Sequence, residues 1–248
     1  MTEVLSNGNK NVGIYGANGL PFVDKEARAM IEAAGLTNPF ADKKWAVFGD
    51  SISQPNTDGL DKYYNYIANN LGMEVTSYAV GGSGYFKGAG STGYGANNII
   101  DKLTNAPEGY DIISFMAGVN ERHLEMGSPT DATPTGDPTT LCGAVRKCIE
   151  LAIEKYPTAQ IFLITPTLGT DQYATTAQGD LNTFANNQIE IAKIYNIPYI
   201  DLYHASGLRP WNAENAAVYY RDYCHLVAAG HQYVAKLMQK WMQTYLML

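Results

Sequence analysis

The sequence predicts a three-layer α/β/α sandwich built on a parallel sheet. Apolar runs alternate with segments of helical periodicity from residue 44 to the end of the 248-residue chain. Two of these runs, Ile112–Met116 and Ile161–Ile164, are apolar almost throughout, as strands covered on both faces must be. Alternating strands and helices favour parallel strands joined by right-handed crossovers, and the length suits a single domain.

The individual elements follow from the same patterns. Strands are expected where short apolar runs end in turn residues, at 45–49, 74–80, 111–117, 160–165 and 197–202. Helices are expected where apolar residues recur on one helix face, at 59–71, 96–105, 139–156, 177–195 and 227–245. Because ligands bind beyond the carboxyl ends of parallel strands, the turn-rich loops that follow strands should wall the site. These loops are 81–97, 122–138 and 167–180.

Residues 1–43 are interpreted as an N-terminal extension ahead of a single α/β domain at 44–248. A short helical pattern over Val23–Ala34 ends at Gly35, and Asn38-Pro39 then breaks the chain before the first core strand. The extension contains apolar residues that need burial, which favours a clasp packed on the domain over a free linker. These residues are Ile14, Tyr15, Leu20, Phe22 and Ile31.

Composition excludes several classes of partner. A net charge of −7 with scattered lysines and arginines argues against nucleic acid, which requires a basic face. No apolar stretch is long enough to span a membrane. The start lacks the features of a signal peptide, so a cytoplasmic location and export within a larger assembly both stay open. The oligomeric state also stays open. Three cysteines without a CxxC pair, namely Cys142, Cys148 and Cys224, fit reduced or buried thiols better than a disulfide framework.

Four short blocks carry the chemical information. Trp45–Ser51 reads WAVFGDS and places a serine at the carboxyl end of a strand, ahead of a helix-like segment whose N–H groups favour negative charge. The blocks Ala79–Gly84 (AVGGSG), Gly118–Glu121 (GVNE) and Asp222–His225 (DYCH) follow in order. Each block alone has an ordinary structural explanation, such as a helix N-cap for the serine or a turn residue for the asparagine.

The order and content of these blocks resemble the SGNH (GDSL-type) hydrolase family over roughly residues 44–241. The resemblance implies five parallel strands in the order 2-1-3-4-5, a flavodoxin-like arrangement. It implies Ser51 as nucleophile, His225 as general base and Asp222 as the residue that orients His225. It further implies an oxyanion hole formed by the N–H groups of Ser51 and Gly84 and by the side chain of Asn120. The family usually has Asp after this asparagine, whereas this chain has Glu121.

Each assignment has a rival within the chain. Ser53 is a second serine in the first block, and Gly82 is an alternative to Gly84. His204 also belongs to an Asp-x-x-His motif, Asp201–His204, but no helix is predicted after it, whereas the spacing after His225 matches the last block of the family. No pair of histidines has the spacing of a metal site, so neither a metal nor another cofactor is expected.

The expected substrate is a small-molecule or oligosaccharide ester, and specifically an O-acetylated carbohydrate. The loops are rich in glycine and tyrosine, and aromatic rings with polar tips suit sugar faces. A lipase-like or thioesterase activity on longer acyl chains and an inactive carbohydrate-binding module are the alternatives. Predicted substrate-binding residues are Asp50, Tyr85, Glu121, His123 and Tyr173, although for Asp50 a structural hydrogen bond within the turn is favoured.

Overall fold

The computed structural model describes residues 38–55, 59–86, 97–121, 125–169, 175–176, 179–222 and 224–246. Its centre is a parallel sheet with strand order β2-β1-β3-β4-β7, and this confirms the predicted fold class and strand order. The strands are β1 (Lys44–Gly49), β2 (Glu74–Ser77), β3 (Ile112–Met116), β4 (Gln160–Ile164) and β7 (Tyr199–Ile200). A short antiparallel pair, β5 (Thr175–Thr176) and β6 (Gly179–Asp180), lies outside this sheet.

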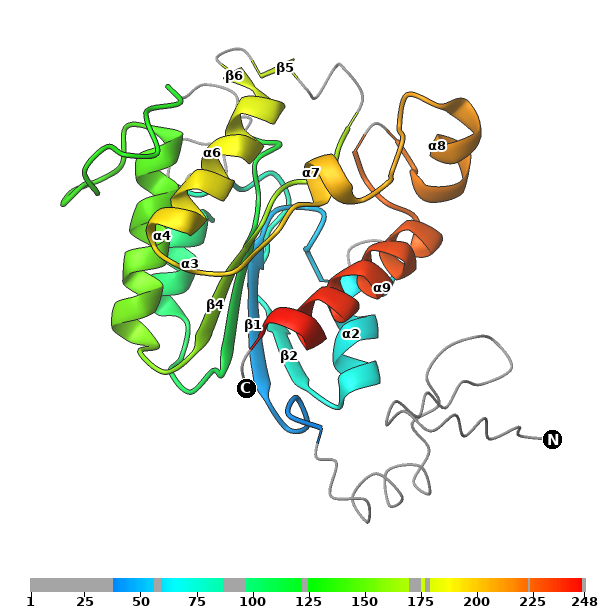
Figure 1. The fold of residues 1–248 in the computed structure, drawn as a ribbon, viewed down its shortest axis with the longest axis horizontal. Helices are drawn as coiled ribbons and strands as arrows, with labels where there is room; N and C mark the ends of the chain where they lie inside the picture. The colour runs from blue at the N-terminus through cyan, green and yellow to red at the C-terminus, as the bar shows by residue number, and fades with distance from the viewer. Residues whose placement is uncertain are drawn as a thin grey trace.

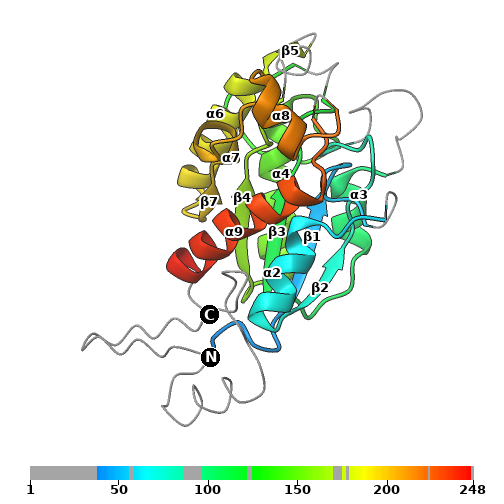
Figure 2. The ribbon, with the colours of Figure 1, turned by 90° about the vertical axis from the view of Figure 1, so that its right-hand side faces the viewer.

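Helices cover both faces of the sheet, as Figure 1 shows with the sheet nearly edge-on. One layer contains α3, α4 and α6, and the other contains α2 and α9 (Figure 2). The bounds of these helices are α2 (Tyr63–Leu71), α3 (Ile99–Asn105), α4 (Leu141–Lys155), α6 (Leu181–Ile194) and α9 (Ala228–Tyr245). Two short helices that the sequence pattern did not predict, α7 (Leu202–Ala205) and α8 (Ala213–Tyr219), connect β7 to α9.

The alternation of side chains along β1 explains why both faces need a helical layer. Trp45 and Val47 belong to the apolar cluster that packs against α2 and α9. Ala46 and Phe48 belong to the cluster on the opposite face, with residues of α3, α4 and α6. All four side chains are fully buried, and the indole N–H of Trp45 donates to Ser114 Oγ of β3 at 2.9 Å. Strand β1 therefore has no solvent-facing side.

Part of the predicted N-terminal extension packs on the domain. Phe40 is buried in the same cluster as Trp45, and the N–H of Asp42 donates to the carbonyl of Gly72 at 2.8 Å. Residues 1–37, on which the choice between linker and clasp depends, lie outside the described residues. The division at residues 43 and 44 therefore stays a prediction.

Gly230 lies in the first turn of α9, where this helix meets the end of α8. A Cβ atom at Gly230 would lie 2.3 Å from the carbonyl oxygen of Tyr219, which is backbone and cannot rotate away. Gly230→Ala should therefore lower the free energy of unfolding by about 1–3 kcal/mol, the usual cost of overpacking. Gly136→Ala is the control, because a Cβ there has nothing within 4 Å. Urea denaturation compares the two variants, and equal stabilities would contradict the close approach.

Candidate active site

Ser51 lies in a turn at the carboxyl end of β1. The carboxylate oxygen Oδ1 of Asp50 accepts from the N–H of Ile52 at 3.0 Å, and the N–H of Ser53 donates to the Asp50 carbonyl at 3.1 Å. A Cβ on Gly49 would lie 2.6 Å from the Met116 carbonyl oxygen, which explains the glycine before this turn. The expected helix does not follow directly, since residues 51–53 form a turn and α2 begins at Tyr63. Ser51 therefore lies in a turn and not at a helix terminus.

His225 and Asp222 occupy a loop between α8 and α9. The loop is closed by a bridge between Tyr220 and Leu226 and by the N–H of Arg221, which donates to the His225 carbonyl at 2.8 Å. Within it, Asp222 Oδ1 accepts from the N–H of His225 at 2.8 Å, and Asp222 Oδ2 lies 2.8 Å from His225 Nδ1. The carboxylate therefore fixes both the backbone and the ring of His225.

The other ring nitrogen of His225 reaches the serine. His225 Nε2 lies 2.8 Å from Ser51 Oγ, so one chain of hydrogen bonds links Asp222, His225 and Ser51. Because a carboxylate only accepts, Nδ1 carries a proton and Nε2 is left to accept the serine proton. Burial raises the pKa of Asp222, but the N–H groups of Cys224 and His225 and the imidazole outweigh this effect and leave that pKa below its usual value. Asp222 is therefore ionised at neutral pH.

The second and third blocks meet beside this serine. Asn120 Nδ2 donates to the Ser83 carbonyl at 2.9 Å, and Ser83 Oγ donates to the Gly49 carbonyl at 3.1 Å. One N–H of the Asn120 amide thus holds the loop after β2, and the second N–H of the same group does not take part in this hydrogen bond. Among the described residues, no acceptor pairs with the N–H groups of Ser51 and Gly84. These donors are the three groups that the family resemblance assigns to an oxyanion hole.

Two rivals from the sequence have structural roles instead. Ser53 is fully buried and its hydroxyl pairs with the Tyr63 hydroxyl at 2.9 Å. Gly82 has a φ of 73°, which a turn after Val80 requires, since the N–H of Ser83 donates to the Val80 carbonyl at 3.1 Å. Gly84 lies outside this turn, and its φ is not positive.

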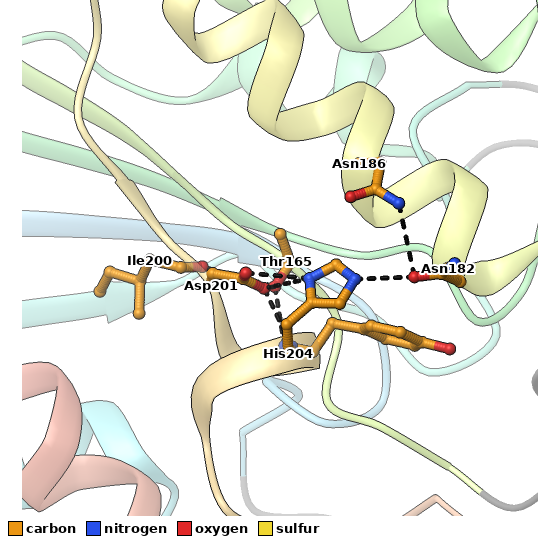
Figure 3. Close-up of polar contacts among 7 residues, drawn as sticks. Thr165, Asn182, Asn186, Ile200, Asp201 and His204 are labelled. Carbon is orange, nitrogen blue, oxygen red and sulfur yellow. Dashed lines mark hydrogen bonds and ion pairs between the residues drawn. The ribbon is translucent and has the colours of Figure 1, made fainter.

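The second Asp-x-x-His motif copies the local geometry of the first but meets a different partner. His204 Nδ1 lies 2.9 Å from Asp201 Oδ2, and the N–H of His204 donates to Asp201 Oδ1 at 3.1 Å. However, His204 Nε2 lies 2.7 Å from Asn182 Oδ1, at the start of α6 (Figure 3). An amide oxygen is not a nucleophile for acyl transfer, so this pair lacks the group that Ser51 supplies.

Three of the predicted substrate-binding residues are not at the surface of the site. For Tyr85 and Glu121 that prediction was wrong, whereas for Asp50 the favoured hydrogen bond within the turn is confirmed. Asp50 is 1% exposed, while Tyr85 and Glu121 are 0% exposed. Tyr85 accepts from Gln188 Nε2 at its hydroxyl, and Glu121 accepts from the N–H of Tyr85. Because they are buried and hydrogen-bonded within the protein, the three side chains have a structural role beneath the site. The other two predicted residues, His123 and Tyr173, lie outside the described residues.

Two supporting residues were missed by the sequence reasoning. Ser83 joins the strand end at Gly49 to Asn120, and its place in the small-residue block Ala79–Gly84 was the available signal. The hydroxyl of Tyr220 donates to the Leu168 carbonyl at 2.8 Å and thereby ties the loop of His225 to the segment after β4. Nothing in the local sequence distinguishes Tyr220 from the other tyrosines.

Other potential sites do not coincide with this one. A cavity of about 790 Å³ lies along β7 between the ends of α6 and α9, lined by residues such as Tyr199, Leu237 and Trp241 and by no residue of the Ser51 site. Asp222, Cys224 and His225 hold their ligand atoms within 4.8 Å of one another, but Asp222 and the ring Nδ1 already pair. The three cysteines are buried free thiols, and no described helix is long and apolar enough to span a membrane.

Comparisons with solved structures show the same fold in other proteins. A protein from Lactobacillus plantarum is 22% identical, with a TM-score of 0.71, and the match covers 84% of this chain and 99% of that one. The lipase/acylhydrolase from Enterococcus faecalis is 16% identical, with a TM-score of 0.54, and coverages of 83% and 97%. An active-site mutant of a family two carbohydrate esterase from Clostridium thermocellum is 16% identical, with a TM-score of 0.59, and coverages of 83% and 64%. No curated protein matches the chain.

The solved structures show the fold, and a match to a family model shows to which family the chain belongs. The model of the GDSL-like lipase/acylhydrolase family matches residues 47–233. This segment contains residues 47–51 of the first block, including Ser51, and the whole of the other three blocks. The chain therefore belongs to the GDSL-like lipase/acylhydrolase family.

Proposed function

We propose that the protein is a serine ester hydrolase that acts through an acyl-enzyme at Ser51. The observation that carries this proposal is the pair of 2.8 Å contacts that link Ser51 Oγ to His225 Nε2 and His225 Nδ1 to Asp222. A serine hydroxyl becomes nucleophilic when a base lies within hydrogen-bond reach and a third group orients that base. These contacts meet both conditions within a family of acylhydrolases.

The proposed reaction uses the same groups in both halves. Ser51 Oγ attacks the ester carbonyl carbon while His225 Nε2 takes the hydroxyl proton, and Asp222 stabilises the resulting imidazolium. The oxygen of the tetrahedral intermediate accepts from the N–H groups of Ser51 and Gly84 and from Asn120 Nδ2. His225 then gives its proton to the departing alcohol. Water attacks the acyl-enzyme with His225 again as base, which releases the acid and restores Ser51.

The proposed substrate is an O-acetylated carbohydrate. The loops 81–97, 122–138 and 167–180 are rich in Gly and Thr and poor in Leu and Ile, and they contain Tyr85, Tyr94 and Tyr173. Trp211, between α7 and α8, is 67% exposed, and an exposed indole suits stacking against a sugar ring. A carbohydrate esterase is also among the proteins that share this fold.

Two other functions compete with this one. A lipase-like or thioesterase activity is suggested by the name of the lipase/acylhydrolase with the same fold, and it would need an apolar groove for a long acyl chain. An inactive carbohydrate-binding module would retain the fold without turnover. The assembled contacts among Ser51, His225 and Asp222 argue against this second alternative.

Replacement of the proposed nucleophile tests the reaction class. Ser51→Ala should lower kcat for p-nitrophenyl acetate by at least about 10⁴-fold, because no other described hydroxyl meets His225 Nε2. Circular dichroism should show an unchanged fold. His204→Ala is the control and should retain activity. Full activity of Ser51→Ala, or loss of activity in a folded His204→Ala, would contradict the assignment.

The two Asp-x-x-His motifs allow a matched test of the acid. Asp222→Asn keeps an oxygen for the loop N–H groups but loses the charge and favours the wrong imidazole tautomer, so kcat should fall by about 10³–10⁴-fold. Asp201→Asn makes the same chemical change at the copy with the same local geometry and should leave kcat within about threefold. Steady-state kinetics at pH 7.5 compares them, and similar losses in both variants would refute the assignment of Asp222.

A series of nitrophenyl esters from acetyl to decanoyl tests the substrate class. A buried CH₂ group adds roughly 0.8 kcal/mol only where an apolar groove receives it. Without such a groove, kcat/KM should fall as the acyl chain extends beyond about four carbons. An acetylated oligosaccharide should release acetate faster than a simple acetate ester with an equally good leaving group. If decanoyl esters are the best substrates, the lipase-like alternative replaces the carbohydrate proposal.

A further inference from the structure

A buried carboxyl group lies directly behind the proposed oxyanion hole. Glu121 follows Asn120 in sequence, is 0% exposed, and accepts from the N–H of Tyr85 at Oε1, at 2.9 Å. Asn120 binds the carbonyl of Ser83 on the same loop. Two consecutive residues after β3 therefore form hydrogen bonds to the loop, one at Ser83 and one at Tyr85, and Gly84 lies between these two residues. The position of the Gly84 N–H thus depends on both bonds.

The environment of Glu121 disfavours a negative charge. Its second oxygen, Oε2, is buried and has no hydrogen-bond partner among the described residues. Burial, followed by repulsion from the charge of Asp50, outweighs the N–H group of Tyr85 and raises the pKa of Glu121 to about 8. Among the described residues, the titratable groups that interact with Glu121 are Asp50, Tyr85 and Cys148, and none of these three is a cation. At neutral pH, Glu121 is therefore a neutral acid.

The loop also has hydrogen bonds that do not involve Glu121. The Gly84 carbonyl accepts from the N–H of Ile99 at 3.0 Å, and the Tyr85 carbonyl accepts from the N–H of Ile100 at 3.1 Å. The Tyr85 ring is held separately, because its hydroxyl accepts from Gln188 Nε2 at 2.7 Å. What Glu121 contributes to the loop is the acceptor for the N–H of Tyr85.

We propose that Glu121 is a positioning residue that sets the oxyanion hole by holding the N–H of Tyr85 and, through it, the N–H of Gly84. Glu121 does not touch the substrate, and it acts in its uncharged form. The proposal rests on the esterase function given above. It assigns a specific role to the residue at which this chain departs from the Asp usual in the family: the longer side chain reaches the loop from the strand end.

Kinetics with two variants of similar length tests the proposal. Glu121→Gln retains an oxygen at the position of Oε1, and kcat should stay within about threefold. Glu121→Met removes the acceptor, so kcat should fall about 10–100-fold with KM nearly unchanged, since the hole acts on the transition state. The affinity for phenylboronic acid, which forms a tetrahedral adduct on serine, should fall with kcat. A folded Glu121→Met with unchanged kcat and boronate affinity would overturn the proposal.

Hydrogen exchange of the Tyr85 amide, followed by NMR, gives a readout that does not depend on turnover. The amide should exchange slowly in the wild type and in Glu121→Gln, and at least tenfold faster in Glu121→Met. If Glu121→Met does not fold, Glu121→Asp takes its place, because it keeps the carboxyl group but shortens its reach. Equal protection in all variants would overturn the proposal. A wild type that cleaves no ester would refute the esterase function, while the exchange measurement would still decide the role of Glu121.

The pH dependence of stability tests the uncharged form. A carboxyl whose pKa is raised on folding contributes stability below its unfolded pKa of 4.5, and this contribution is lost as pH rises toward about 8. The melting temperature of the wild type should therefore fall between pH 5 and 9 more steeply than that of Glu121→Gln, which does not titrate. The remaining slope of Glu121→Gln reflects Asp50 and other groups. Identical slopes would mean that Glu121 is ionised in the folded protein and would contradict the proposal.

Discussion

The site depends on one contact between two distant parts of the chain. Ser51 Oγ and His225 Nε2 lie 2.8 Å apart although 174 positions separate them in sequence. The parallel sheet makes this contact geometrically natural, because every crossover returns the chain to the same edge and so brings successive strand ends together. The turn after β1 supplies the serine, and the loop before α9, a helix that packs on the same face of the sheet as α2, supplies the histidine. Any shift between α9 and the sheet would therefore separate the base from the nucleophile.

Short polar contacts then lock the strand ends to one another. Ser83 bonds to the end of β1, Asn120 bonds to Ser83, and Glu121 bonds to Tyr85, so residues after three neighbouring strands form one hydrogen-bonded unit. Two carboxyl groups, Asp50 and Glu121, are buried within this unit, with pKa values raised to about 7 and about 8. Burying such groups costs free energy of folding. Both groups lie near the proposed nucleophile Ser51, where fixed dipoles contribute most to stabilising a transition state.

The fold could be read from the sequence because strands buried on both faces leave a strong local signal. All five predicted strands are present, although β2 and β7 are shorter than expected. The seven-residue helix α8 was missed because it buries none of its own side chains and so has no apolar stripe. The predicted roles of Tyr85 and Glu121 in substrate binding failed for a related reason. Proximity in sequence to a site residue does not tell whether a side chain points into the site or behind it.

The two Asp-x-x-His motifs show where local information ends. By itself, the sequence determined that an aspartate three residues before a histidine binds both its backbone N–H and its ring Nδ1, and this geometry is present at Asp222 and at Asp201. Only the tertiary structure decided what the opposite ring nitrogen meets. For His225 it is the hydroxyl of Ser51, and for His204 it is the amide oxygen of Asn182. The physical reason is that the motif orients the imidazole through hydrogen bonds between residues three positions apart. The partner of the opposite ring nitrogen is instead set by the packing of whole helices on the sheet.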